Sequence, residues 1–154
     1  MNIDFEKNNY EFNARVSAII YNKEKTKVLL FKVEDGRDYF LLPGGRIELN
    51  EDSKSAIERE IKEELNFELN YELCSVQENF VSKENKKIMQ YCFCYKGIYN
   101  GKIEKNIIKC LDNDGQSFYW IDLDKINEYI IYPLSSKDLI INNNGMIQHI
   151  VEKM

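Results

Sequence analysis

Three glutamates near the middle of the chain, Glu60, Glu63 and Glu64, have the chemistry and the spacing of a cation site. Residues 55–65 contain no glycine or proline and are acceptable or good helix formers, so we expect a helix from about Asp52 to Leu65. At about 100° per residue, Glu60 and Glu64 lie one turn apart and Glu63 lies next to them. The three border an apolar stripe that consists of Ile57, Ile61 and Leu65.

Two interpretations of this acidic run compete. In the first it is a solvated face balanced by Lys54, Arg59 and Lys62, which is the usual meaning of an isolated charge run. In the second it binds a divalent cation, because carboxylate oxygens are hard ligands suited to Mg²⁺ or Mn²⁺. Like charges one turn apart repel, so a helix that only packs gains nothing from placing them beside its apolar stripe. The residues before the helix decide in favour of the cation.

These preceding residues stand at fixed intervals from the helix. Gly45 is followed after five residues by Glu51, and after seven more by Arg59-Glu60. The stretch resembles the Nudix box, and the positions that carry the resemblance are Gly45, Glu51, Arg59, Glu60, Ile61, Glu63, Glu64 and Phe67. Asn66 stands where the family has its last glycine. Asparagine enters left-handed backbone conformations readily, so it can still end the helix.

The resemblance implies a Mg²⁺-dependent phosphohydrolase, with Mn²⁺ as a substitute ion. Its reaction would be the hydrolysis of a diphosphate linkage in a nucleoside di- or triphosphate derivative, by water attack at phosphorus. The implied metal ligands are the Gly44 carbonyl and the carboxylates of Glu60, Glu63 and Glu64. The same three glutamates and Arg59 are the implied catalytic residues. Glu60 is either a ligand or the general base.

Two residues of the same stretch are expected to brace the glutamates. Pro43-Gly44-Gly45 predicts a turn, because proline fixes its φ and glycine permits conformations closed to other residues. Gly45 would shape this loop. Glu51 can pair with Arg59 across the loop, and Arg59 can reach Glu63 one turn on, so the pair would orient carboxylates rather than touch the substrate. A purely structural role for Arg59 and Glu51 is the alternative.

Residues outside the stretch add two further sets of candidates. Some family members take another carboxylate from a later loop as base or ligand. The polar segment 100–115, which we expect to be a loop beside the site, offers Glu104, Asp112 and Asp114. The aromatic rings that could stack on a base or sugar are Tyr39, Phe80, Tyr91 and Tyr119. Solvated loop charges and core packing are the respective alternatives.

The composition limits the partners and the compartment. The chain has 154 residues, which suits a single domain over residues 1–154, and its net charge of −5 argues against bulk nucleic acid or an anionic membrane as a partner. No apolar run is long enough to span a bilayer and the N-terminus lacks a secretory segment, so we expect a cytoplasmic protein. The expected partner is a small-molecule nucleotide or other diphosphate, and a homodimer is left open. The four cysteines are expected to be reduced packing residues.

The order of the predicted elements indicates an α/β fold. Strands are expected over residues 12–21, 27–33 and 39–42 before the helix, and over 68–81, 87–99, 117–121 and 147–151 after it, with short helices near 123–129 and 136–141. The first two strands suggest a hairpin. A mixed sheet between helices suits this order, and it resembles the Nudix α/β/α sandwich.

Two other functions are compatible with the resemblance. A non-catalytic sensor would bind a nucleotide without turning it over, although degenerate domains of this kind usually lose glutamates that this chain keeps. An isoprenoid diphosphate isomerase would need a catalytic cysteine near the site, and Cys74 or Cys110 would have to serve. The metal-dependent hydrolase is therefore the leading hypothesis.

Overall fold

The computed structural model describes residues 1–154. Its strands are β1 (Asp4–Lys7), β2 (Tyr10–Asn22), β3 (Lys27–Val33), β4 (Tyr39–Leu41), β5 (Gly44–Arg46), β6 (Glu72–Lys83), β7 (Lys86–Tyr99), β8 (Ile107–Lys109), β9 (Gln116–Asp122), β10 (Ile130–Tyr132) and β11 (Gln148–Lys153). Its helical segments are α1 (Ser53–Leu65), the 3₁₀ helix η1 (Leu123–Glu128) and α2 (Ser136–Ile141).

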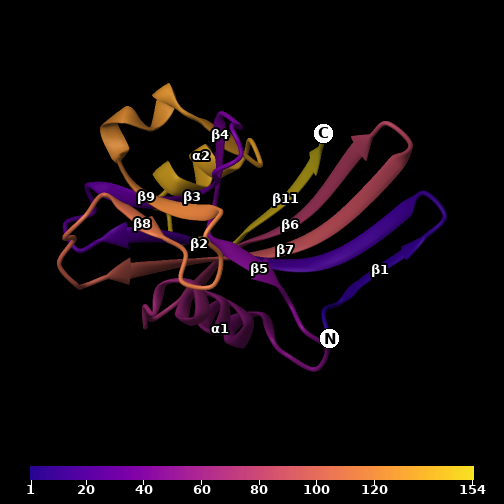
Figure 1. The fold of residues 1–154 in the computed structure, drawn as a ribbon, viewed down its shortest axis with the longest axis horizontal. Helices are drawn as coiled ribbons and strands as arrows, with labels where there is room; N and C mark the ends of the chain where they lie inside the picture. Colours follow the sequence, from indigo (N-terminus) through magenta and orange to yellow (C-terminus); the bar gives the residue numbers. More distant parts are fainter.

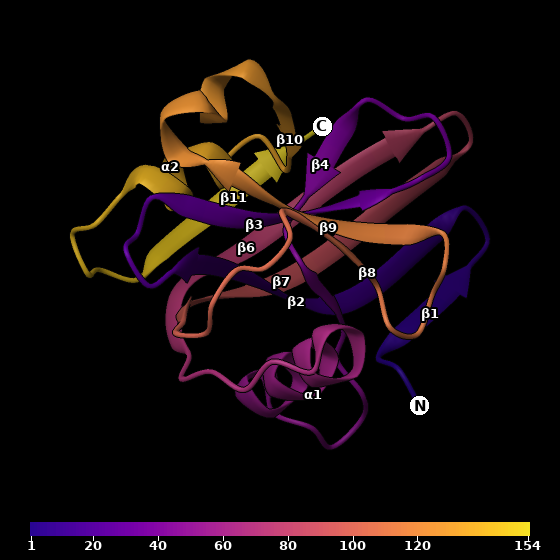
Figure 2. The ribbon, with the colours of Figure 1, turned by 60° about the vertical axis from the view of Figure 1, so that its left-hand side comes forward.

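One mixed sheet organises all of these elements. The main path through it is β10-β4-β3-β2-β7-β6-β11, with β1 and β5 paired to β2 and with β9 paired to β3 and β8. Helix α1 covers one face, whereas η1 and α2 lie on the other side (Figures 1 and 2). The α/β fold with a mixed sheet between helical layers, predicted from the sequence, is confirmed.

Strand β2 contributes to both halves of the core because its side chains alternate between the two faces of the sheet. On the α1 side it supplies small and branched residues to one hydrophobic cluster: Ala14, Val16, Ala18 and Ile20. On the opposite side Ile19 and Tyr21 enter a second cluster together with Ile126 of η1 and Leu139 of α2. The two clusters place β2 at the centre of the molecule, beside the helix that carries the glutamates.

Helix α1 begins and ends where the sequence indicates. The Asp52 side chain accepts a hydrogen bond from the backbone N–H of Ser55 at 2.8 Å, which caps the first turn. Asn66 has φ 57°, and its N–H donates to the Lys62 carbonyl at 2.9 Å. The left-handed end that the family forms with glycine is therefore formed here with asparagine. The predicted apolar stripe, which consists of Ile57, Ile61 and Leu65, is buried.

The long strands β6 and β7 form a hairpin and join β2 to the edge of the sheet. The β6–β7 pairing is antiparallel from Glu72↔Lys96 to Lys83↔Lys86. Strand β7 also runs parallel to β2 over its whole length, and β11 runs parallel to β6. Rows of side chains from four distant segments consequently cross one sheet.

Several elements differ from the sequence-based expectation. Gly44 and Gly45, expected in a turn with Pro43, belong to strand β5, because this segment pairs with β2 at Gly44↔Ser17 and Arg46↔Arg15. The predicted hairpin of β2 and β3 pairs at Tyr21↔Val28 alone, since β3 pairs along its length with β9. These pairings join residues distant in sequence, which a local pattern does not reveal.

The remaining differences concern short elements. Segment 100–115 is not entirely loop, because it includes β8, and the predicted helix near 123–129 is a 3₁₀ helix. Strands β1 and β10 were not predicted: β1 is exposed throughout and β10 has only three residues. All four cysteines are free, as expected. Neither helix combines the length and the apolar character that crossing a membrane requires.

Candidate active site

Two glycines of β5 let the backbone approach the glutamate helix closely. A Cβ at Gly45 would lie 2.2 Å from the carboxyl carbon of Glu60, and a Cβ at Gly44 would lie 2.0 Å from the Val16 carbonyl oxygen. Both distances are far below any normal contact, so neither position accepts a side chain without a shift of its neighbour. Gly45 is therefore the residue against which the Glu60 carboxylate is seated.

Arg59 connects the loop to the helix and makes the contacts that the sequence led us to expect. Its guanidinium forms a two-pronged bond to Glu51, with distances of 2.7 Å from Nε and 2.9 Å from Nη2. The Nη1 atom lies 3.1 Å from Glu60 and 3.6 Å from Glu63, and Nη2 donates to the Arg46 carbonyl at 3.1 Å. The hydrogen bond from Arg59 lowers the pKa of Glu51. This network fixes the orientation of Glu60 and Glu51 on either side of one guanidinium.

Glu64 is the buried carboxyl group of the site, with 8% of the residue exposed. Burial first, and then the neighbouring carboxyl group of Glu60, raise the pKa of Glu64 to about 9. The charges of Asp112 and Glu63 act in the same direction. A cation placed beside Glu64 would favour the charged form of this carboxyl group.

The donor chemistry fits a divalent cation, although the side chains do not form a ready ligand set. No three Asp, Glu, His or Cys side chains lie together in a metal-binding arrangement, because the Glu63 carboxylate is half exposed and faces Arg59. The Glu60 carboxylate lies against Gly45 and next to the carboxyl group of Glu64, so the two side chains bring hard oxygen atoms together. A divalent ion there would let both carboxyl groups carry charge.

Of the three later carboxylates, Asp112 is the one whose charge acts on Glu64. The backbone N–H of Leu111 donates to the Glu64 carbonyl at 2.9 Å, which fixes the 110–115 segment on the end of α1. The Cys110 thiol donates to Asp112 at 3.0 Å, and burial raises the pKa of that thiol to about 12. Asp114 is exposed on the turn that follows.

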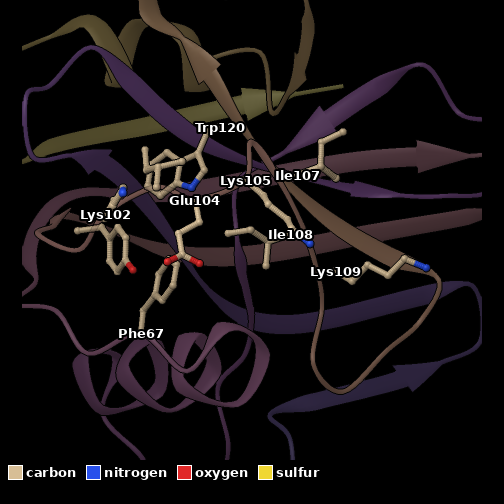
Figure 3. Close-up of a pocket in the computed structure, with 10 residues that line it drawn as sticks. Phe67, Lys102, Glu104, Lys105, Ile107, Ile108, Lys109 and Trp120 are labelled. Atoms are coloured by element: carbon tan, nitrogen blue, oxygen red, sulfur yellow. The ribbon is translucent and has the colours of Figure 1, made fainter.

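Glu104 belongs to a separate pocket of about 820 Å³ at the end of α1. Phe67 stacks on Tyr99 there, with ring centroids 4.1 Å apart, and Trp120 lies beyond Tyr99. Figure 3 shows the Glu104 carboxylate next to the Phe67 ring, among the lysines of the segment. Glu104 therefore lies in a pocket distinct from the Glu60–Glu64 pair.

The four aromatic residues proposed for substrate contact do not come together. The ring of Tyr39 packs on Tyr132, and that of Tyr119 packs on Phe40. Tyr91 packs on Phe12, and Phe80 sits opposite Met89 in the β6–β7 ladder. Each ring thus lies against a neighbour. Phe80 and Tyr91 are on the α1 side of the sheet, whereas Tyr39 packs on β10 and Tyr119 packs on β4.

Sequence reasoning missed the polar side chains of β2 that border Gly44. Arg15 and Ser17 face away from α1, and Ser17 pairs directly with Gly44. The signal was present: Asn13, Arg15 and Ser17 interrupt one face of an otherwise apolar strand. Because side chains alternate between the two faces of a strand, this pattern predicts that one face of β2 is packed and the other is polar.

Comparison with known proteins places the chain among others of the same architecture. A family model described as NUDIX domain matches residues 11–139, whereas no curated protein matches the sequence. The mutator MutT protein from Bacillus halodurans is similar with a TM-score of 0.64 at 19% identity, over 89% of each chain. The E. coli dihydroneopterin triphosphate pyrophosphohydrolase is similar with a TM-score of 0.59 at 18% identity, over 82% of this chain and 91% of that one.

Proposed function

Because this chain belongs to the NUDIX domain family, we propose that it uses Mg²⁺ or Mn²⁺ to hydrolyse a diphosphate linkage in a nucleoside triphosphate or a nucleoside diphosphate derivative. Family membership establishes the reaction class, a Nudix-type phosphohydrolase. The ion and the substrate are the proposal. The single observation that carries it is the buried Glu64 carboxyl group beside Glu60 and Gly45.

The residues of the chain have separate tasks in this reaction. Glu60, Glu64 and the Gly44 carbonyl would hold the ion, with Glu63 turning from Arg59 to join them. A bound divalent ion would neutralise the diphosphate and lower the pKa of a bound water. Arg59 keeps Glu60 in place through its fork on Glu51. Asp112 is our candidate for accepting a proton from the attacking water, because it is the later carboxylate whose charge acts on Glu64.

One of the similar structures bears a name that agrees with the substrate class. It acts on dihydroneopterin triphosphate, a triphosphate attached to a heterocycle. At 18–19% identity these likenesses support the fold, so the substrate rests on the site itself. A pair of carboxyl groups that needs a cation suits an anionic substrate that brings phosphate oxygens to the same ion.

The test is a release assay for phosphate and pyrophosphate on a panel of nucleotides and nucleoside diphosphate derivatives, with Mg²⁺, with Mn²⁺ and with a chelator. We expect metal-dependent turnover that falls by about 10²-fold or more in Glu64→Gln. Glu58→Gln is the matched control, because Glu58 is an exposed glutamate on the same helix. Unchanged turnover in Glu64→Gln would contradict the proposal. Nucleotide binding without metal dependence or turnover would favour the sensor.

The same assay separates the three later carboxylates. Asp112→Asn should lower kcat and flatten the acidic limb of the pH profile if Asp112 accepts a proton. Glu104→Gln and Asp114→Asn are matched controls from the same segment, and we expect both to retain activity. A larger loss of kcat in Glu104→Gln than in Asp112→Asn would assign the role of proton acceptor to Glu104, in the pocket of Figure 3.

A further inference from the structure

The pocket of about 820 Å³ at the end of α1 is separate from the active site. Its lining comes from Phe67, from Tyr99 at the end of β7, from Trp120 of β9 and from residues 102–109 (Figure 3). None of the glutamates of α1, and neither glycine of β5, lines it. Small-molecule sites in proteins occupy about 300–1,000 Å³ and combine an apolar lining with a few polar groups. The pocket has the size and the composition of such a site.

Three stacked aromatic rings form one wall of this pocket. Phe67 and Tyr99 stack with 4.1 Å between their ring centroids, and the Trp120 centroid lies 5.9 Å from that of Tyr99. A Cβ at Gly101 would collide with the Tyr99 hydroxyl group, so the backbone passes close to this ring. The apolar part of the lining also includes Ile103, Ile107 and Ile108. Aromatic rings that are ordered by their own packing offer a surface on which a planar heterocycle can pack.

The buried indole of Trp120 has a hydrogen-bond donor that the protein does not use. Trp120 is only 4% exposed, and its backbone N–H donates to the Asn106 carbonyl at 2.8 Å. The indole N–H, by contrast, donates to no atom of the protein, and Figure 3 shows the ring nitrogen turned toward the other residues that line the pocket. Buried polar groups are almost always paired. The indole N–H therefore marks a position for an acceptor atom of a ligand.

The charged residues of the pocket are mainly basic. Lys102, Lys105 and Lys109 line it together with a single carboxylate, that of Glu104. The lysines that form ion pairs in this protein lie elsewhere, on β3, α1 and β7, so the three lysines of the pocket have no carboxylate partner. The chain as a whole has a net charge of −5, and this cluster is therefore a local exception. It attracts an anion, and a lysine ammonium group is a common binder of phosphate.

We propose that this pocket is a second ligand site, which binds a nucleoside monophosphate whose base carries an amino group. The lysines would contact the phosphate, and the base would pack against the aromatic wall. The Trp120 N–H requires an acceptor and the Glu104 carboxylate requires a donor, and adenine presents a ring nitrogen directly beside its amino group. Because the active-site glutamates do not line the pocket, the inference goes beyond the proposed function and holds whether or not the protein hydrolyses nucleotides.

Trp120 is the only tryptophan of the chain, so its fluorescence reports directly on this pocket. Adenosine monophosphate, adenosine and ribose 5-phosphate are titrated separately into the protein with a chelator present, so that no divalent ion contributes. We expect a saturable change in emission with adenosine monophosphate and at least about tenfold weaker binding of the other two compounds, because each lacks one half of the contacts. Inosine monophosphate, which lacks the amino group, should also bind more weakly, and Glu104→Gln should reduce this difference.

Variants locate the ligand within the molecule. The double variant Lys102→Gln/Lys105→Gln should weaken binding of adenosine monophosphate by about tenfold or more. Its matched control is Lys54→Gln/Lys125→Gln, which removes two exposed lysines outside the pocket. Glu64→Gln should leave the affinity unchanged, and it should do so even if the protein proves to hydrolyse nothing.

Three results would overturn the inference. The first is the absence of any binding of adenosine monophosphate, and the second is equal affinity for adenosine monophosphate and ribose 5-phosphate, which would mean that the lysines attract anions of any kind. The third is an affinity that is lost in Glu64→Gln but kept in Lys102→Gln/Lys105→Gln, which would place the ligand in the active site. Binding with the expected pattern in a protein without turnover would keep this inference and reject the proposed reaction.

Discussion

Around Arg59 of α1 the charged side chains are paired, whereas on the sheet face beside β2 several buried polar atoms have no partner. Arg59 alone contacts Glu51, Glu60 and Glu63. Across β2, β6 and β11, by contrast, Asn13, Asn79 and Glu152 retain unpartnered acceptors. In the first region the charged side chains hold one another in place, whereas in the second the buried acceptor atoms have no partner within the protein.

Gly45→Ala should give the largest effect, because it disturbs the prearranged region alone. The new Cβ would meet the carboxyl group of Glu60, the end of a flexible side chain that can move aside. We therefore expect kcat/KM to fall by about 10²-fold or more, as for a misplacement of about 1 Å, while the fold persists. Steady-state kinetics and chemical denaturation measure the two effects. If the activity of Gly45→Ala is lost only because the protein has unfolded, Gly45 serves folding rather than catalysis.

Arg59→Lys tests whether the helix site depends on geometry or merely on charge. Lysine keeps the charge but cannot form the fork on Glu51 while also reaching Glu60. We expect the affinity for Mn²⁺ to fall by about 10- to 100-fold, the usual range for residues that orient metal ligands. Titration calorimetry with Mn²⁺ measures this, and Lys62→Arg on the same helix is the control. If Arg59→Lys binds Mn²⁺ as tightly as the wild-type protein, the charge at position 59 is sufficient and the geometry of the fork is not required.

The stability of the metal-free protein should depend on pH through Glu64. Its pKa is raised from 4.5 to about 9, so between these values the folded protein holds a proton that the unfolded chain has released. The free energy of unfolding must therefore fall as pH rises through this window. Denaturation in a chelator at several pH values should show a decline in the wild-type protein that is weaker in Glu64→Gln. Added Mn²⁺ should stabilise more at high pH, and identical profiles for the two proteins would contradict this.

Asn13→Leu tests the sheet face, where we expect the substitution to leave the free energy of unfolding unchanged or to raise it. The substitution removes an unpartnered buried oxygen, and Glu11 keeps its ion pair with Lys86 at 2.7 Å. Because an unsatisfied buried group is destabilising by about 1–3 kcal/mol, we expect unfolding to become harder by about 1 kcal/mol or to stay unchanged. Denaturation of the ligand-free protein tests this. A clear loss of stability would mean that Asn13 is a structural residue, and the contrast between the regions would narrow.

Asn66→Gly should have the smallest effect. Asn66 already has φ 57° and closes α1, so glycine would relieve only a small backbone cost, a few tenths of a kcal/mol. The melting temperature should therefore rise slightly, and activity should not change. A marked gain in activity would indicate that the family's glycine does more than end the helix.

The sequence by itself determined the helix site. Asp52, the stripe of Ile57, Ile61 and Leu65, and Asn66 set the limits and the orientation of α1 through contacts within one or two turns. The distances between Gly45, Glu51, Arg59 and the glutamates are likewise short in sequence. Local spacing therefore predicted both the element and the chemistry, and the family match over residues 11–139 confirmed the family.

Only the tertiary structure decided which other groups share the site. Strand β5 exists because Gly44–Arg46 lies against β2, and Asp112 lies near Glu64 because Leu111 donates to the end of α1. The polar side chains opposite α1 lie in rows because β2, β7, β6 and β11 align in register, although β2 and β11 are more than a hundred residues apart in the sequence. Alternation along a strand predicts that two faces exist, but not which residues of another strand stand beside them. Non-local pairing supplies that information, and for this reason the sequence indicated the reaction class while only the fold showed which residues lie beside the glycines of β5.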